Sequence, residues 1–237
     1  MKLTIERIVD AGMATFTEVG YQGLSMRQVA ERLDVHAGSL YYHVKNKESL
    51  LRLMAERVAR GGYEAGSSAL ARLPAEADWS ARVEAQIVAL RQSILHHPGG
   101  ALLLAESPKS LSDSALSLME RLLDTLVDGG VPTSDAIIAA DTMLSHVTGF
   151  VLQEQIEPHP LPVDVSVVAD LRARYPLTTS GAAAYEQDEQ FVRSVRLICW
   201  GIRALITESD AHGDAGRPGH GTLSAGETLS DLLGDRP

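Results

Sequence analysis

The residues with the most distinctive spacing form the run SMRQVAERLDVHAGSLYYHVKNK, at positions 25–47. Two short segments with helical periodicity, 26–33 and 39–43, are separated here by a turn at 35–38. In a helix–tight turn–helix layout the helices cross steeply, and the second can lie in the major groove of duplex DNA, which is wide enough for one helix. Small and polar side chains in its first turn let the backbone approach the base edges. The chemistry predicted for this segment is hydrogen bonding to bases and phosphates.

Several side chains of this run suit such contacts. Its small residues and its hydroxyl and imidazole groups are Ala37, Gly38, Ser39, Tyr41, Tyr42 and His43. Arg27 lies early in the preceding helix, where its guanidinium can reach a phosphate or a guanine edge. Lys45 and Lys47 flank the start of the next helix, whose free backbone amides also attract phosphate. On periodicity alone, a small three-helix unit with surface tyrosines is an equally good interpretation.

Helical periodicity also dominates the rest of the chain, so the expected fold class is all-α. The expected helices are 4–19, 26–33, 39–43, 46–62, 78–97, 112–128, 133–157 and 186–208, with a short segment at 101–106. Their expected N-caps and capping pairs are Thr4, Ser25 with Gln28, Asn46 and Asp78. Gly20 and the pair Gly61-Gly62 are expected to end helices. Residues 159–184 hold three prolines and are expected to form a long loop with one helical turn near 166–174.

The composition is that of a folded globular chain. It has 237 residues, of which 45% are hydrophobic and 22% charged, which excludes a mainly disordered chain, a collagen and a coiled-coil rod. No uninterrupted apolar run reaches the roughly 18 residues that a membrane span needs, so no membrane association is expected. The N-terminus lacks the pattern of a secretory signal. The single cysteine, Cys199, cannot form an internal disulfide, which fits a reducing cytoplasm.

The net charge of −10 is unevenly distributed. Residues 1–47 carry six Lys/Arg and five Asp/Glu, a balance of +1, whereas residues 48–237 carry fifteen and twenty-six, a balance of −11. A phosphate-binding surface needs a local excess of cations rather than a basic whole protein. The acidic balance therefore does not exclude DNA as a partner of the first 47 residues.

Residues 3–60 resemble the N-terminal domain of the tetracycline-repressor (TetR) family. The resemblance is carried by GYQGLS after the first helix, by MRQVAERLDV and by SLYYHVKNKESLL. More weakly, HHPGGA (96–101), HVTGFVLQEQ (146–155) and FVRSVRLICWGIRAL (191–205) resemble the C-terminal domain of the tetracycline-binding members. This implies a three-helix helix-turn-helix DNA-binding domain at 1–47 and a helical ligand-binding and dimerisation domain at 48–209, with 46–62 as the connecting helix. The glycine-rich remainder, 210–237, is expected to be a flexible tail.

The resemblance also assigns DNA contacts. It places contacts at Ser25, Met26 and Arg27, along the recognition helix from Ala37 to His43, and at Lys47. Where the family's tetracycline-binding members have Gln-Pro, this chain has Ala37-Gly38, which cannot make a bidentate base contact. A different operator is therefore expected, recognised more by Arg27, the tyrosines and DNA shape. Leu40 and Val44 fall on the opposite face and are expected in the core.

Two late helices carry too many apolar residues for one buried face. The apolar residues are Ile137, Ala140, Met143, Leu144, Val147, Phe150 and Val151 in the helix 133–157, and Phe191, Val192, Val195, Ile198, Cys199, Trp200, Ile202, Leu205 and Ile206 in the helix 186–208. A helix that is apolar around more than half of its circumference normally packs against other helices on two sides. We therefore expect a homodimer through a four-helix bundle, with Gly149 and Gly201 permitting close approach. A larger monomeric core is the alternative.

The family's effector pocket corresponds to positions of mixed character in this chain. The matched tetracycline-binding positions are Tyr63, Gln86, Leu90, Leu104, Ser107 and Glu154, and Met143 and Phe150 are expected to add apolar wall. Plain core packing is the alternative for Met143 and Phe150, and His146 is equally well an interior histidine or a ligand contact. The family's magnesium-holding histidine corresponds to Leu104, or to Leu103 in a register shifted by one. We therefore expect no metal and no cofactor, and an effector such as a bulky, partly polar antibiotic or polyketide.

These features together favour a ligand-responsive repressor that binds a palindromic operator as a homodimer. An activator of the same architecture and a helical protein that binds only other proteins are the alternatives. An enzyme is disfavoured, because no nucleophile-elbow, phosphate-loop or zinc-spaced pattern is present. His96 and His97 are adjacent on a helix and point to different sides, and Cys199 lies among apolar neighbours where a thiol stays protonated.

Overall fold

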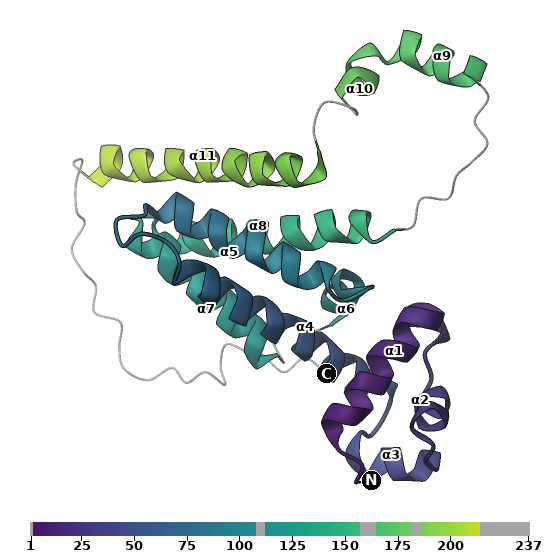
Figure 1. Ribbon diagram of the computed structural model, residues 1–237. Helices are drawn as coiled ribbons and strands as arrows, with labels where there is room; N and C mark the ends of the chain where they lie inside the picture. The colour runs from purple at the N-terminus through teal and green to yellow at the C-terminus, as the bar shows by residue number, and fades with distance from the viewer. Residues whose placement is uncertain (1, 108–111, 157–164, 182–185, 214–237) are drawn as a thin grey trace, which may run out of the picture.

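The computed structural model describes residues 2–107, 112–156, 165–181 and 186–213, and every regular element in these ranges is an α-helix (Figure 1), as the sequence predicted. The first four helices are α1 (Ile5–Gly23), α2 (Met26–Leu33), α3 (Ala37–His43) and α4 (Lys47–Leu70). The next four are α5 (Trp79–Leu95), α6 (Gly100–Glu106), α7 (Asp113–Asp128) and α8 (Thr133–Glu154). The last three are α9 (Val165–Arg174), α10 (Pro176–Gly181) and α11 (Gln187–Gly213).

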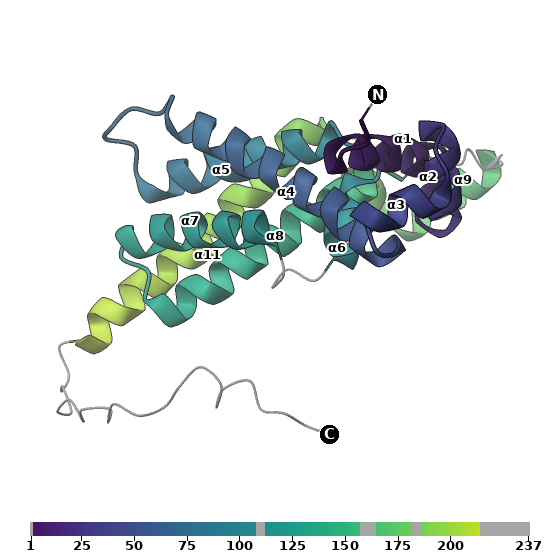
Figure 2. The ribbon, with the colours of Figure 1, turned by 90° about the horizontal axis from the view of Figure 1, so that it is seen from below.

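Helices α1–α3, which we call the head, lie together at one end of the molecule (Figures 1 and 2). The predicted caps are confirmed: Thr4 Oγ1 accepts the Arg7 N–H at 3.3 Å, and Ser25 Oγ accepts the Gln28 N–H at 3.3 Å. Gly20 has the predicted helix-breaking conformation, with φ of +71°, although one more turn carries α1 to Gly23. Leu40 and Val44 lie in the head's core, as expected.

The recognition helix α3 begins two residues earlier than the sequence predicted. Its N-cap is His36, whose carbonyl accepts the Ser39 N–H at 2.9 Å, so Ala37 and Gly38 belong to the first helical turn rather than to the preceding loop. The turn is short because Asp34, in the left-handed region at φ of +54°, reverses the chain directly after α2. Asn46 then caps α4 as predicted and accepts the Ser49 N–H at 2.8 Å.

The predicted end of α4 at Gly61-Gly62 is wrong, because this helix continues to Leu70. A Cβ atom on Gly62 would lie 2.3 Å from Leu90 Cδ1 of α5, and one on Gly66 would lie 2.3 Å from an Arg121 guanidinium nitrogen of α7. These glycines therefore serve close packing of α4 against α5 and α7, not termination. As a result α4 runs without a break from the head into the body of the molecule (Figure 1).

The body is a bundle of α4, α5, α6, α7, α8 and α11 around an apolar core. Asp78 and Ser112 cap α5 and α7, with 2.8 Å and 3.1 Å to the Ala81 and Ala115 N–H groups. By length and composition α8 could cross a membrane, which the count of uninterrupted apolar residues did not predict. It packs instead against α5, α6, α7 and α11 and buries Met143 and Val147 completely. One face of α8 is therefore part of the core, although only 33% of its apolar stretch is buried.

The region expected to be a loop with one turn holds two helices in its described part, α9 and α10. Pro176 is the first residue of α10, where its missing N–H leaves no hydrogen bond unmade. The two helices pack on each other and extend away from the bundle (Figure 1). At the end of the chain α11 reaches Gly213, past the predicted 208, and the rest of the expected tail lies outside the described residues.

The close approach at Gly62 is testable. We expect Gly62→Val to lower the free energy of unfolding by about 1–3 kcal/mol, because the new side chain must displace Leu90 from a packed core. Ser68→Val is the matched control, because Ser68 is exposed on the same helix and the substitution introduces the same β-branched side chain. Urea unfolding at one fixed protein concentration measures both changes. Equal losses in the two variants would show that α4 and α5 do not meet at Gly62.

Candidate nucleic-acid interface and ligand cavity

The recognition helix presents a polar face to solvent. Tyr42 is 88% exposed and Tyr41 50% exposed, while Leu40, on the other side of the helix, is fully buried. Gly38 and Ser39 are also exposed, at the start of the same helix. His43 is half-buried and packs its ring edge-on against Tyr42, with 5.2 Å between the ring centroids. The structure thus brings the predicted small and hydroxyl-bearing residues of α3 to one accessible surface.

The start of α2 exposes fewer side chains than the sequence suggested. The Met26 side chain is only 6% exposed and packs in the core of the head, so the DNA contact predicted at Met26 would fall to its backbone. The Ser25 hydroxyl donates to Gln28 Oε1 at 2.8 Å, and it serves as the N-cap. Arg27 is well exposed and forms a surface ion pair with Glu31 at 2.9 Å. Of the three residues, Arg27 has the accessible side chain.

Lys47 has a partner within the protein. Its ammonium donates to the Tyr21 carbonyl at 2.9 Å and lies 5.5 Å from the centroid of the Tyr21 ring. Tyr21 follows the kink at Gly20, so this contact fastens the end of α1 to the first residue of α4. The sequence did not point to Tyr21, because a hydrogen bond across 26 residues leaves no local pattern.

A cavity of about 590 Å³ lies in the body, between α4, α6, α7 and α8. Leu90, Leu104 and Ser107 line it, as the sequence suggested, and Leu103 is buried in the core instead. The wall also includes residues that the sequence did not single out, namely Ala55, Ala59, Leu116, Leu118, Met119, Leu144, Thr148 and Leu152. The wall is mostly apolar. Its polar groups are the hydroxyls of Ser107, Ser112, Ser145 and Thr148 and the carboxylate of Asp141.

Tyr63 and Gln86 do not line this cavity but belong to a polar cluster between α4, α5 and α7. The Arg121 guanidinium donates to the Tyr63 carbonyl at 2.6 Å and to Gln86 Oε1 at 2.9 Å. The Gln86 amide donates to Thr125 Oγ1 at 2.9 Å, and Arg121 lies 4.5 Å from the Tyr63 ring centroid. Because these polar groups bond to one another, they hold three helices together in this structure.

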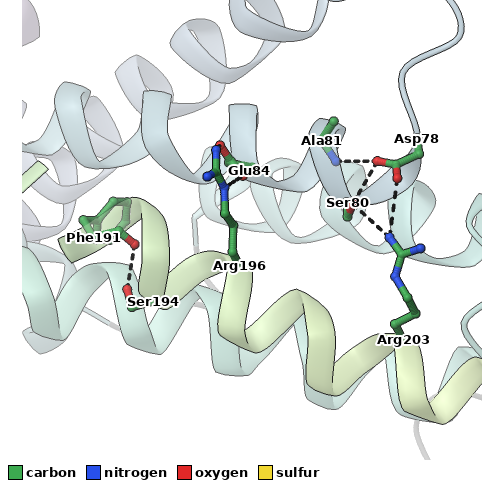
Figure 3. A network of polar contacts seen from close by, with 8 residues as sticks. All are labelled: Asp78, Ser80, Ala81, Glu84, Phe191, Ser194, Arg196 and Arg203. Atoms are coloured by element: carbon green, nitrogen blue, oxygen red, sulfur yellow. Dashed lines mark hydrogen bonds and ion pairs between the residues drawn. The ribbon is translucent and has the colours of Figure 1, made fainter. Parts of the chain in front are cut away.

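Met143, His146 and Phe150 also lie outside the cavity wall. Met143 is fully buried, and the His146 ring stacks on Phe191 with 5.7 Å between centroids and 5° between planes. Phe150 packs edge-on against Phe191 at 5.0 Å. The Ser194 hydroxyl donates to the Phe191 carbonyl (Figure 3), so the 2.7 Å contact between His146 Nε2 and Ser194 Oγ is a bond donated by the imidazole. Burial lowers the pKa of His146, which therefore favours the neutral ring.

Glu154 is held by a buried arginine. Arg91, with a side chain only 5% exposed, donates to Glu154 through two nitrogens, at 2.5 Å and 2.9 Å, and to Asp188 at 2.7 Å. Its guanidinium also lies 5.0 Å from the centroid of the Phe191 ring. The hydrogen bond to Glu154 raises the pKa of Arg91. This cluster joins α5, α8 and α11, and it uses the carboxylate that the resemblance placed among the ligand contacts.

Helix α11 is fastened to α5 by surface ion pairs (Figure 3). Arg196 donates to both carboxylate oxygens of Glu84, at 2.7 Å and 2.9 Å, and Arg203 lies 3.4 Å from Asp78 Oδ2 and 3.2 Å from Ser80 Oγ. Trp200, 66% accessible, lies one helical turn from each of these arginines, on the same side of α11. A groove of about 380 Å³ between α8 and α11 lies on another side of this helix, where Ile138 of α8 and Ile198 and Leu205 of α11 line it. An apolar surface thus follows α8 and α11.

Two sequence comparisons identify the family to which these features belong. Residues 8–54 match the bacterial regulatory proteins of the tetR family, and residues 72–206 match the tetracyclin repressor-like C-terminal domain. The chain belongs to the TetR family. The members of this family that it matches are bacterial transcriptional regulators.

The TetR relatives are similar over most of the folded chain. An HTH-type transcriptional regulator of Saccharopolyspora erythraea is 31% identical over 159 residues, which cover 66% of this chain and 63% of that protein. The class C tetracycline repressor of Escherichia coli is 26% identical over 223 residues, covering 88% and 95% of the two chains. The crystal structure of a possible TetR family transcriptional regulator from Streptomyces coelicolor has a TM-score of 0.69 and 28% identity, covering 85% of this chain and all of that one.

The buried ion pair between Arg91 and Glu154 gives the prediction for this TetR-family body. We expect Arg91→Met to lower the free energy of unfolding by about 3–5 kcal/mol, because it leaves Glu154 buried without a counter-charge. The double variant Arg91→Met, Glu154→Leu removes both charges, so we expect it to recover most of the loss. Chemical unfolding of the single and double variants measures the difference. A double variant that is no more stable than the single one would contradict this account.

Proposed function

We propose that the protein is a repressor that binds a palindromic operator as a homodimer and leaves it when a bulky, partly polar organic molecule binds. The observation that carries this proposal is the course of α4. One end of this helix, at Lys47, is fastened to the head, and its middle residues Ala55 and Ala59 form part of the cavity wall. A molecule that fills the cavity therefore touches the helix on which the head is mounted.

The proposed division of labour follows the sequence: residues 1–47 bind DNA, and residues 48–209 bind the ligand and the second subunit. In the head, Arg27, Ser39, Tyr41 and Tyr42 offer exposed donors to bases and phosphates. Ala37 and Gly38 are small enough to let the start of α3 approach the groove. The apolar surface of α8 and α11 supports a two-fold dimer, which would set two recognition helices about 34–36 Å apart, one DNA turn.

The cavity's chemistry supports the class of effector. Its wall is mostly apolar with a few hydroxyl groups, which suits a fused-ring antibiotic or another polyketide better than a small ion. Leu104, which the resemblance matches to the family's magnesium-holding histidine, lies on the wall, and Leu103, the alternative match, is buried in the core. Neither leucine can ligate a metal ion, so we propose an effector that binds without magnesium.

Ligand binding would release DNA by changing the contacts between α4 and α7. The Glu56 carboxylate accepts from the Ser112 hydroxyl at 2.5 Å, from the Ser114 hydroxyl and from the Ser114 N–H at 3.2 Å. Ser112 lines the cavity, so a ligand there lies beside the contacts that hold α4 to α7. Binding that favours a second orientation of α4 would move both heads from their spacing, and operator DNA must then weaken ligand binding by the same factor.

Other functions of the same fold have less support. An activator would use the same head and cavity, and the position of its operator would decide the sign of regulation. A protein-binding module without DNA affinity would retain no duplex at any salt concentration, and the experiment below separates it from the proposal. The single buried cysteine and the matched regulators are in keeping with a cytoplasmic protein.

DNA binding is tested with duplexes selected from a random pool by the purified protein. We expect Tyr42→Ala and Arg27→Ala each to weaken the selected duplex by about 5- to 150-fold, because each removes an exposed donor at the interface. Binding should also weaken with added salt, because part of the contact is to phosphates. Tyr175→Ala is the control, because Tyr175 is a half-exposed tyrosine on the far α9–α10 unit. Failure of the wild-type protein to retain any duplex at low salt would end the proposal.

The effector site is tested by filling the cavity. Gly149 lines the cavity and not the groove along α8 and α11, whereas Gly201 lines that groove. A Cβ atom on Gly149 would meet nothing within 4 Å, so Gly149→Leu should occupy the cavity without disturbing the core or the surface proposed for the dimer. Against a panel of polyketide antibiotics, including tetracycline with and without Mg²⁺, we expect this variant to lose at least about tenfold in affinity while it keeps its operator affinity. Gln153→Leu, on the exposed side of α8, is the control. Unchanged affinity in Gly149→Leu would place the effector elsewhere.

A further inference from the structure

The turn between α5 and α6 is a contact point between the head and the body. Gly99 has φ of +71°, and a Cβ atom on it would lie 2.3 Å from Cε1 of Phe16. Phe16 belongs to α1 and is 3% exposed. The backbone of this turn therefore lies directly against an aromatic ring of the head, with no room for a side chain between them.

One side chain holds that turn in place. The Gln155 carboxamide, directly after α8, donates to the Ile94 carbonyl at 3.3 Å and to the His97 carbonyl at 2.9 Å. Its oxygen accepts the Ala101 N–H at 3.2 Å. Carbonyls at the end of a helix and N–H groups at the start of the next have no partner within their own helices. Gln155 thus satisfies the end of α5 and the start of α6 at the same time.

The helices joined by this side chain also form the cavity wall. Leu152 precedes Gln155 by one helical turn, and Leu104 and Ser107 follow Ala101 along α6 and its end. A shift of α6 or of the end of α8 is therefore passed to the turn, and from Gly99 to Phe16. This path is separate from the contacts of Glu56 with α7.

We propose that Gln155 is a positioning residue that fixes the angle of the head relative to the effector cavity, through the α5–α6 turn and Phe16. The proposal rests on the proposed function, because the head angle matters when two heads must meet two half-sites. Its consequence is specific: Gln155 governs which spacing of half-sites the dimer accepts, and it leaves the contacts of a single head with DNA unaltered.

A carboxamide is needed at this position, because its nitrogen donates hydrogen bonds while its oxygen accepts one. The amide group donates to two carbonyls, and the oxygen accepts one N–H. Gln155→Glu keeps the size but replaces the donor with a charged acceptor that faces two carbonyl oxygens. Gln155→Ala removes all three bonds. Gln153→Ala is the matched control, because Gln153 is an exposed glutamine in the last turn of the same helix.

The experiment measures binding of the dimer to four duplexes derived from the selected palindrome. They carry the original spacing, one base pair more, one base pair less, and a single half-site. One base pair moves the half-sites by about 3.4 Å and turns them by about 35°. We expect wild-type protein and Gln153→Ala to prefer the original spacing by at least about tenfold, and Gln155→Ala and Gln155→Glu to reduce that preference below about threefold. The affinity for the single half-site should be equal in all four proteins.

Amide hydrogen exchange supplies a readout that needs no DNA. We expect faster exchange at Ala101 in Gln155→Ala, because the Ala101 N–H loses its acceptor, and not in wild-type protein or Gln153→Ala. Gln155→Glu keeps an oxygen that can accept this N–H, so its Ala101 should stay protected. Unchanged spacing preference in the Gln155 variants would overturn the proposal, as would an equal loss on all four duplexes, which marks a general loss of fold. A wild-type protein that binds no duplex would instead remove the proposed function on which this inference rests.

Discussion

The structure depends on one constraint, which is that α4 belongs to the head and to the body at once. A 24-residue helix is about 36 Å long, and it transmits displacement because its backbone bonds resist bending. The body can grip it only because Gly62 and Gly66 let α5 and α7 approach its backbone. At the other end, Lys47 and the buried Leu50 and Met54 fix it to α1. Any change that reorients α4 in the body therefore reorients the head.

The polar groups of the body are used mainly to hold this bundle together. Arg91 and Arg121 each join three helices, and each takes up a residue that the family resemblance had placed among the ligand contacts, Glu154 and Gln86. A buried charge is tolerated when its partner and its hydrogen bonds are complete, and among the described residues no buried side-chain nitrogen or oxygen lacks a hydrogen-bond partner. The cavity beside these clusters is left mostly apolar. Its selectivity among ligands must then come from its shape, from a few hydroxyl groups and from the Asp141 carboxylate.

The helix boundaries that local hydrogen bonds determine could be predicted from the sequence. The features that depend on packing between distant residues could not. Thr4, Asn46 and Asp78 were identifiable as N-caps because a cap bonds to an amide two or three residues away. Gly62 was misjudged because a glycine that ends a helix and a glycine that faces another helix look alike until the facing residue, Leu90, is known. The candidate site residues show the same difference between local and distant interactions. The exposed face of α3 followed from its own spacing, whereas the partners of Gln86 and Glu154 lie 35 to 63 residues away in the chain.

If the proposed function holds, the charges of the head explain how a small rotation of the head relative to the body releases DNA. The first 47 residues carry a balance of only +1, and most of their cations have partners within the protein. Arg27 pairs with Glu31 and Arg32 with Glu18, while Arg7 and Lys47 donate to backbone carbonyls. Each head then gains little from phosphate neutralisation, and the acidic body adds repulsion rather than attraction. Tight binding would require both heads at once. If both heads must bind at once, a small change in head angle can leave each head able to bind its own half-site while it prevents the second head from reaching the DNA. The dimer then loses most of its affinity for the operator.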